Sequence, residues 1–419
     1  MLKSIIRKEI LCNLLSYKFS IITILSTILI LVSIFVMYGD YCLALENYEI
    51  LRSKSENPPA VIPPIPLSIF AKGLEENLCR SYEPGFVGSI DISSTQKSVN
   101  KLFKLFTTPD LLYVIKVILS LCAMLFAFDI ICGEKEIGTL RQSLSCSLKR
   151  PILIIGEWVG GFTSFILPFF IAVLLGTIFV TLSPMVDMNA QDWAKLGLFL
   201  LSGVIYLAAF FSLGLLISCL THRSSTSLVI SLFVWAILVF LIPNLGNILA
   251  RQFVQIPTAQ QLELKRGQIM NRARFEYERI PKTQPDFEKR EKALRLRTIA
   301  EGDKLDEDYR NRLNKLVKVS QNITRFSPAP AFTFLATDIM GTGMAEERRL
   351  KRAVLQYRKI LYTNENRDEK GKPPIFNYQR SSVKEILGQG GLSNCLILIL
   401  LNILFFTGAH LAFLRYDVR

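Results

Sequence analysis

The hydrophobic residues of this chain are gathered into six blocks that are nearly free of charge and are separated by polar segments. A helix needs about 20 apolar residues to cross about 30 Å of hydrocarbon, and each block is long enough. The pattern predicts six membrane-spanning helices, placed at residues 19–38, 111–132, 152–182, 194–220, 227–249 and 393–414. The third block is longer than one straight crossing needs, and Gly160, Gly161 and Pro168 are expected to break or tilt it.

The first 18 residues predict an amphipathic helix. Leu2, Ile5 and Ile10 recur at helical spacing, and the basic side chains of Arg7 and Lys8 fall on the opposite side. A basic helix of this kind suits the membrane surface. We therefore expect residues 1–18 to form an interfacial helix before the first span.

Two long polar segments interrupt the spans. Residues 39–110 contain a cluster of prolines between Pro58 and Pro66, around which extended or irregular backbone is expected. Residues 250–392 are rich in Glu, Lys, Arg and Leu, which favour helix. Two antiparallel helices at 258–279 and 285–326 would form a stalk, followed by a charged helix at 344–362.

The basic residues of the short loops predict the orientation of the chain. Residues 133–151 and the tail 415–419 carry Lys and Arg, whereas the short loop 183–193 carries Asp187 and Asp192 and neither basic residue. Short basic loops stay in the cytoplasm. We expect a multi-pass protein of the cell membrane with both termini cytoplasmic. The predicted fold is all-α, with a large, mainly helical extracytoplasmic domain.

Composition adds two points. The net charge is +14, and most of the excess lies between residues 250 and 384. Because that segment lies between two spans, a solvated helical surface, anionic headgroups or an acidic partner explain it better than nucleic acid does. Neither a CxxC pair nor a metal-ligand cluster is present among the eight cysteines and two histidines. Cys42 and Cys79 could form a disulfide in an oxidising compartment.

Three charged residues fall inside predicted spans, where they are costly and often functional. Lys116 lies near the outer end of the second span and can extend its amine to the interface. Asp129 and Glu157 lie near inner span ends, where Arg141 or Lys149 could pair with them. Anchoring at the interface is the simplest role for all three, and coupling or proton transfer are the alternatives.

The link at residues 133–151 begins with Gly133-Glu134-Lys135-Glu136-Ile137-Gly138-Thr139-Leu140-Arg141. It resembles the corresponding link in permease subunits of type-two ABC exporters. In those proteins an acidic residue precedes Gly-Thr-Leu, a short helix and a basic residue. The residues that occupy these places are Glu136, Gly138, Thr139, Leu140 and Arg150.

The resemblance implies that the link enters a cleft of a cytoplasmic ATPase subunit, which the N-terminal helix also touches. Closure of two ATPases on ATP would then rock two permease halves. The ATPase-coupling residues would be Glu134, Glu136, Gly138, Thr139, Leu140, Arg141 and Leu144. The residues themselves are compatible with this role, because Leu140, Leu144 and Leu148 recur every four positions and could form an apolar docking stripe.

The sequence lacks a phosphate-binding loop of the form GxxxxGK followed by Ser or Thr. The chain itself is therefore expected to be neither an enzyme nor a cofactor protein, and ATP and Mg²⁺ would bind to a separate ABC ATPase. Further expected partners are a second copy or a sister permease, membrane lipid and an extracytoplasmic partner. An ion-driven secondary transporter and a membrane-anchored assembly or sensor protein remain alternatives.

Overall fold

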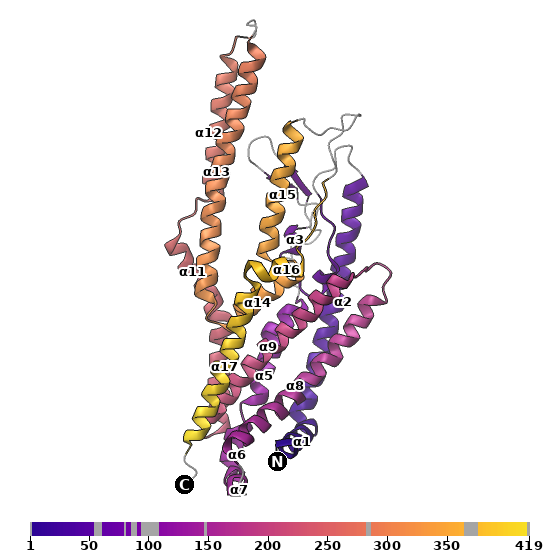
Figure 1. Cartoon of the computed structure of the whole chain (residues 1–419), viewed down its shortest axis with the longest axis vertical. Helices are drawn as coiled ribbons and strands as arrows, with labels where there is room; N and C mark the ends of the chain where they lie inside the picture. Colours follow the sequence, from indigo (N-terminus) through magenta and orange to yellow (C-terminus); the bar gives the residue numbers. More distant parts are fainter. Residues whose placement is uncertain are drawn as a thin grey trace.

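Six helices of the computed structural model are long and apolar enough to cross a membrane, as the sequence predicts. The structure describes residues 2–53, 61–78, 81–84, 90–93, 109–145, 149–281, 286–363 and 376–416. Both termini lie at one end of the helix bundle (Figure 1), which we call the terminal end; the opposite end is the distal end. The six candidate spans are Tyr17–Arg52, Leu111–Ile137, Arg150–Thr181, Ala190–Leu220, Ser224–Phe253 and Leu392–Arg415.

The chain starts with α1 (Leu2–Leu14), the expected short N-terminal helix, and continues into α2 (Tyr17–Ser53). Helix α2 is longer than the predicted first span. Residues 39–53 contain no proline and several strong helix formers, so the helix continues beyond the apolar block. Helix α1 lies on the third span because two glycines leave room for it: a Cβ at Gly156 or Gly160 would meet the side chain of Ile5 or Glu9 at 2.7 Å.

Several spans are built from consecutive helical pieces. The second span comprises α4 (Leu111–Tyr113), the π-helix η3 (Val114–Leu119), α5 (Ser120–Ala127) and α6 (Ile130–Ile137). The fifth comprises α10 (Ser224–Ala236), the π-helix η4 (Ile237–Leu241) and α11 (Ile242–Phe253). The third, fourth and sixth are α8 (Arg150–Thr181), α9 (Ala190–Leu220) and α17 (Leu392–Arg415).

The expected break in the third span is wrong. Helix α8 runs without interruption through Gly160, Gly161 and Pro168. All three are buried against neighbouring elements, and Gly161 makes room for the ring of Phe211. Contacts with neighbouring helices allow Pro and Gly inside membrane helices, so these residues serve packing here.

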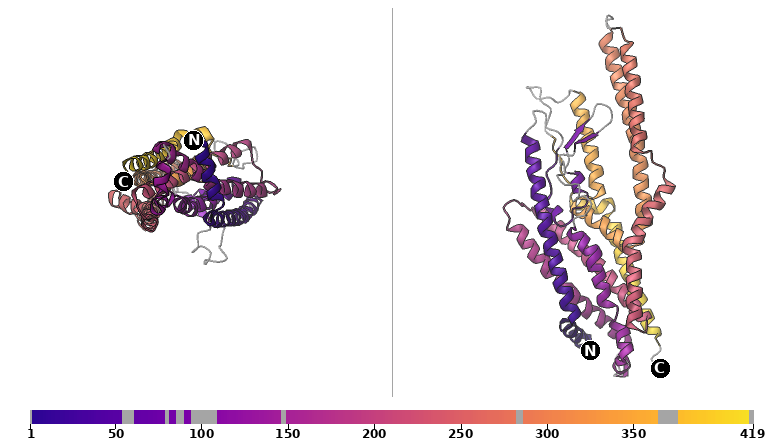
Figure 2. Two further views of the ribbon diagram at one scale, coloured as in Figure 1. Left: turned by 90° about the horizontal axis from the view of Figure 1, so that it is seen from below. Right: turned by 180° about the vertical axis from the view of Figure 1, so that it is seen from behind.

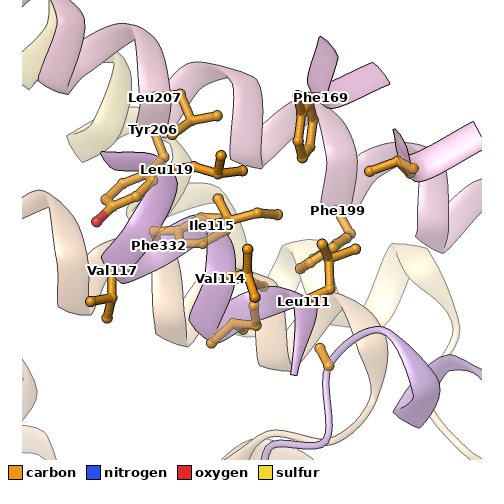
Figure 3. Packing of buried hydrophobic residues seen from close by; sticks show 14 of the residues in the cluster. Leu111, Val114, Ile115, Val117, Leu119, Phe169, Phe199, Tyr206, Leu207 and Phe332 are labelled. Carbon is orange, nitrogen blue, oxygen red and sulfur yellow. The ribbon is translucent and has the colours of Figure 1, made fainter. Parts of the chain in front are cut away.

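Helix α9 is the centre of the bundle. In the most apolar stretch of α9, 72% of the residues are buried, whereas in the most apolar stretch of α17 only 17% are buried. Figure 3 shows part of its packing: Phe332 stacks on Tyr206 with ring centroids 4.5 Å apart, beside Ile115 and Leu119 of the second span. Such a stack adds attraction to ordinary apolar packing. The core therefore joins the second and fourth spans to a residue that lies far along the chain.

The stalk predicted from the charged helices is confirmed. Helices α12 (Ala259–Glu278) and α13 (Phe287–Thr324) lie antiparallel and project from the distal end (Figures 1 and 2). Arg266 pairs with the nearly buried Asp306 across them, at 2.7 Å. The chain then returns through α14 (Pro328–Met340), which packs against α9 and α17 and is largely buried. Helix α14 thus belongs to the bundle, because its apolar side chains are buried against the neighbouring spans.

The remaining elements gather at the distal end around the foot of α15 (Met344–Thr363). They are η1 (Pro66–Ile69), α3 (Glu75–Leu78), β1 (Ser81–Pro84) paired antiparallel with β2 (Ile90–Ser93), α16 (Val383–Ile386) and the π-helix η5 (Leu387–Gly391). We call residues 61–78, 341–357 and 376–386 the distal cap. A small core of Ile62, Leu78, Leu350, Val354 and Tyr357 holds the cap together.

Candidate functional site

The link between the second and third spans is a helix, a turn and a second short helix, α7 (Thr139–Ser145). Gly138 ends α6 in the left-handed region, with φ at 87°, and its N–H donates to the carbonyl of Glu134. Glycine is favoured at this position because it has no Cβ to clash. The Thr139 hydroxyl donates to the same carbonyl at 3.4 Å. The Gly138-Thr139 pair therefore ends α6 and starts α7.

Glu136 binds within the chain. Its Oε2 accepts hydrogen bonds from the Ser224 backbone N–H at 3.0 Å and the Ser224 hydroxyl at 2.8 Å. Ser224 is the first residue of α10, so the carboxylate caps the start of the fifth span. An anion is favoured at a helix N-terminus, where amide groups lack partners within the helix. Glu136 thus ties the link to the loop between the fourth and fifth spans.

Lys135 holds the other side of that loop. Its Nζ donates to the carbonyls of Cys219 at 2.5 Å and Thr221 at 3.0 Å, at the C-terminus of α9. It also lies 4.6 Å from the centre of the Tyr416 ring. A cation is favoured at a helix C-terminus. Two adjacent residues of opposite charge therefore bind the end of one span and the start of the next.

Arg150 repeats this arrangement at the end of the link. Its Nη1 donates to the carbonyls of Leu414 at 2.8 Å and Tyr416 at 3.1 Å, at the C-terminus of α17. Sequence reasoning assigned Glu136 to an ATPase contact and named Arg150 only as part of the family pattern, and it missed Lys135 and Ser224 as site residues. Two adjacent residues of opposite charge beside a span end are only a weak indication of such a site in the sequence, because the groups that Lys135 and Glu136 bind lie more than 80 residues away.

The apolar stripe of the link faces inward. Leu140 is 1% exposed, in a cluster with Ile131, Leu153 and Phe413, and Leu144 packs against the same cluster. Leu148 lies outside the described residues. The expectation that Leu140 faces outward in a docking stripe is therefore wrong, because the neighbouring spans offer it a closer apolar surface. Ile137 is instead an outward apolar residue of the link, at 78% exposed, and Arg141 and Gln142 of α7 are also exposed.

The N-terminal helix reaches the link through charge. Lys8 lies 3.7 Å from Glu134, while Arg7 is exposed. Burial lowers the pKa of Lys8, but Glu134 and the neighbouring acids outweigh it and the net pKa is raised. Burial raises the pKa of Glu9, which lies beside them. The middle of α1 therefore lies against a charged residue of the link.

The other predicted intramembrane charges lie in different surroundings. Asp129 pairs with Lys18, so the expected pairing with Arg141 or Lys149 is not the one formed. Glu157 is 2% exposed, near Glu134 and Glu9. Lys116 lies in η3, at the opposite end of the second span from Asp129, with its amine over the Tyr113 ring. The structure thus brings Glu157 to the link and leaves Lys116 far from it.

These contacts place a helix–turn–helix link and an N-terminal helix together at the terminal end (Figure 1). A family model described as "ABC-2 family transporter protein" matches residues 4–418. The chain belongs to the ABC-2 transporter family. No curated protein matches the sequence. The match covers nearly the whole chain, so the stalk and cap are part of this ABC-2 permease.

The possible disulfide is not established in the ABC-2 permease. Cys42 is half-buried on α2, while Cys79 lies outside the described residues, so their pairing stays a prediction. Among the described residues, no group of three or more His, Cys, Asp or Glu side chains could hold a metal ion. The link is therefore the strongest candidate site.

Removing the Glu136 cap of this permease should loosen the start of the fifth span. In the Glu136→Ala variant we expect amides of the first turn of α10 to exchange about threefold faster or more, because Ser224 loses its acceptor. Hydrogen exchange with mass spectrometry measures this. Glu385→Ala, which removes an exposed carboxylate at the distal end, is the control. Unchanged exchange over residues 224–227 would contradict the capping role.

Proposed function

We propose that this chain is the membrane subunit of an ABC exporter and couples ATP hydrolysis by a separate ATPase to substrate movement. The observation that carries the proposal is the link itself. Its charged residues Lys135, Glu136 and Arg150 bind the ends of three other spans. A force applied to the link would therefore move the fourth, fifth and sixth spans together.

The proposed ATPase contact is the outward side of the link. Ile137 supplies an exposed apolar side chain, and Arg141 and Gln142, exposed on the following helix α7, supply polar groups. An apolar anchor inside a polar rim is the usual form of a protein interface. Helix α1 lies alongside through Lys8 and Glu134, so the ATPase would touch both elements.

The wider proposal follows from this contact. The terminal end would face the cytoplasm of the cell, and the stalk and distal cap would lie outside the membrane on the far side. ATP and Mg²⁺ would be held by the ATPase. A second copy of the chain or a sister permease would complete the pathway, because the family resemblance implies a path between two six-span halves.

Ile137→Asp is the variant that tests the contact. We would co-express the chain with the ABC ATPase encoded nearest to it, purify through a tag on this chain and measure ATPase recovery. Recovery should fall about tenfold, because an apolar anchor at an interface centre carries much of the binding energy. Leu182→Asp is a matched control, since Leu182 is 79% exposed at the distal end. Equal recovery with both variants would refute the proposed contact and favour secondary transport or an assembly role.

A further inference from the structure

A cavity of about 340 Å³ lies between the second span, the fifth span and the stalk base. Lys116 comes from the second span, Val239 and Pro243 from the fifth, Leu316 and Gln321 from α13, and Phe334 from α14. Its volume is within the range of small-molecule sites. Helices α13 and α14, which contribute to its lining, lie nearer the distal end than α6 and α7 of the link (Figure 1).

Both spans change their helical geometry where they border this cavity. In η4 the Ile242 N–H donates to the carbonyl of Ile237, five residues back. The next carbonyl, that of Leu238, would pair with residue 243, which is proline and has no N–H. The hydroxyl of Ser327 donates to it instead, at 2.6 Å. Single π-turns occur often at functional sites. In this one the Ser327 side chain satisfies the carbonyl that proline leaves without a donor.

The second span shows the same feature around Lys116. Lys116 lies in η3, and its carbonyl accepts hydrogen bonds from the hydroxyls of Ser120 at 2.6 Å and Tyr206 at 2.7 Å. Trp235 of the fifth span donates to the Ser120 hydroxyl at 3.0 Å. The backbone that presents Lys116 to the cavity is therefore positioned by three other side chains.

The Lys116 amine has no ion-pair partner among the described residues. Its contact is the Tyr113 ring, with Nζ 5.8 Å from the centroid. Asp110 acts on it electrostatically, but that carboxylate already accepts from the N–H groups of Tyr113 and Lys72. An ammonium beside apolar walls is costly unless an anion compensates it. The Lys116 ammonium therefore keeps N–H groups that can donate to an anion in the cavity.

The other polar groups of the cavity narrow the choice of ligand. The hydroxyls of Thr324 and Thr333 donate to carbonyls of their own helices, both at 2.9 Å. In the described part of the chain the Gln321 side-chain amide forms no hydrogen bond, so its N–H groups can donate to a ligand. Lys116 and Gln321 together offer donors to an anion, while Val239 and Phe334 offer apolar surface.

We propose that this cavity binds an anionic amphiphile, with a phosphate or carboxylate head on Lys116 and Gln321. The apolar chain lies against Val239, Pro243, Leu316 and Phe334. The head group belongs either to a bilayer lipid or to a free amphiphile. This binding is independent of the ATPase and so of the proposed export function.

The test uses the full chain in nanodiscs of zwitterionic phosphatidylcholine. The probe is dodecyl phosphate carrying a diazirine near the end of its chain, and its partner probe is the corresponding alcohol. Photolysis should label peptides covering residues 239–243 and 316–334 with the phosphate probe. Lys116→Met should lower the labelling about tenfold or more, because a charge-assisted contact is lost. Lys116→Arg should retain most of it and shows that the site is folded.

Lys318→Met is the matched control, because Lys318 is exposed on α13 between cavity residues without lining the cavity. Competition by phosphatidylglycerol in the nanodisc would support the proposal and identify bilayer lipid as a source. Competition by free dodecyl phosphate, without competition by phosphatidylglycerol, would support the proposal and identify a free amphiphile as the ligand. Competition by inorganic phosphate would overturn it in favour of a plain anion site. Equal labelling by the alcohol, or labelling unaffected by Lys116→Met, would also overturn it.

Discussion

Replacing Arg380 with methionine should destabilise the distal cap by about 3–5 kcal/mol, because it leaves a buried carboxylate without its cation. Arg380 forms two hydrogen bonds to Glu75, at 2.8 and 2.9 Å. The two side chains are only 12% and 7% exposed. The same guanidinium also donates to the carbonyls of Pro63 and Gly341, at 3.0 and 3.2 Å. One side chain therefore joins three segments of the cap.

Hydrogen exchange over residues 61–78 and thermal unfolding of the purified chain would measure this loss. The double variant Glu75→Leu/Arg380→Met should recover much of it, since the orphaned charge is also removed. Arg274→Met is a suitable control, because Arg274 and its partner Glu278 are 80% and 57% exposed and such pairs contribute about 1 kcal/mol or less. An Arg380→Met variant as stable as this control would contradict the assignment of a buried pair.

Leu140→Asp should destabilise the terminal end by about 3 kcal/mol or more, because it places an unpaired carboxylate where 1% of the side chain is exposed. Ile131, Leu153, Leu215 and Phe413 surround the site. The variant also removes the packing of a buried leucine. Low recovery of folded, monodisperse protein is therefore expected, whether or not an ATPase is present.

The comparison with Ile137→Asp separates stability from binding. Ile137 is 78% exposed, so its replacement should change the unfolding free energy by about 0.5 kcal/mol or less while reducing ATPase recovery. Thermal unfolding of the two variants, each purified without the ATPase, makes the comparison. A stable Leu140→Asp protein that fails only in ATPase binding would mean that Leu140 faces the partner. The inward position of the apolar stripe would then be refuted.

Hydropathy and helical periodicity determined the number and rough positions of the spans, the N-terminal helix and the antiparallel stalk. These features depend on neighbours a few residues apart, so a single sequence carries them. The helix stop at Gly138 is local in the same way, because it needs only a residue that tolerates a positive φ. The turn at the centre of the candidate site could therefore be located from sequence alone.

The tertiary structure decided which partners the polar and apolar groups of the site find. Glu136 caps Ser224 from 88 residues away, and Arg380 meets Glu75 across 305 residues. The same apolar repeat could place Leu140 against the bundle or against an ATPase, since periodicity defines a helix face without naming its neighbour. Only the packing of the spans resolves that choice, because burial and charge pairing depend on what lies opposite in space.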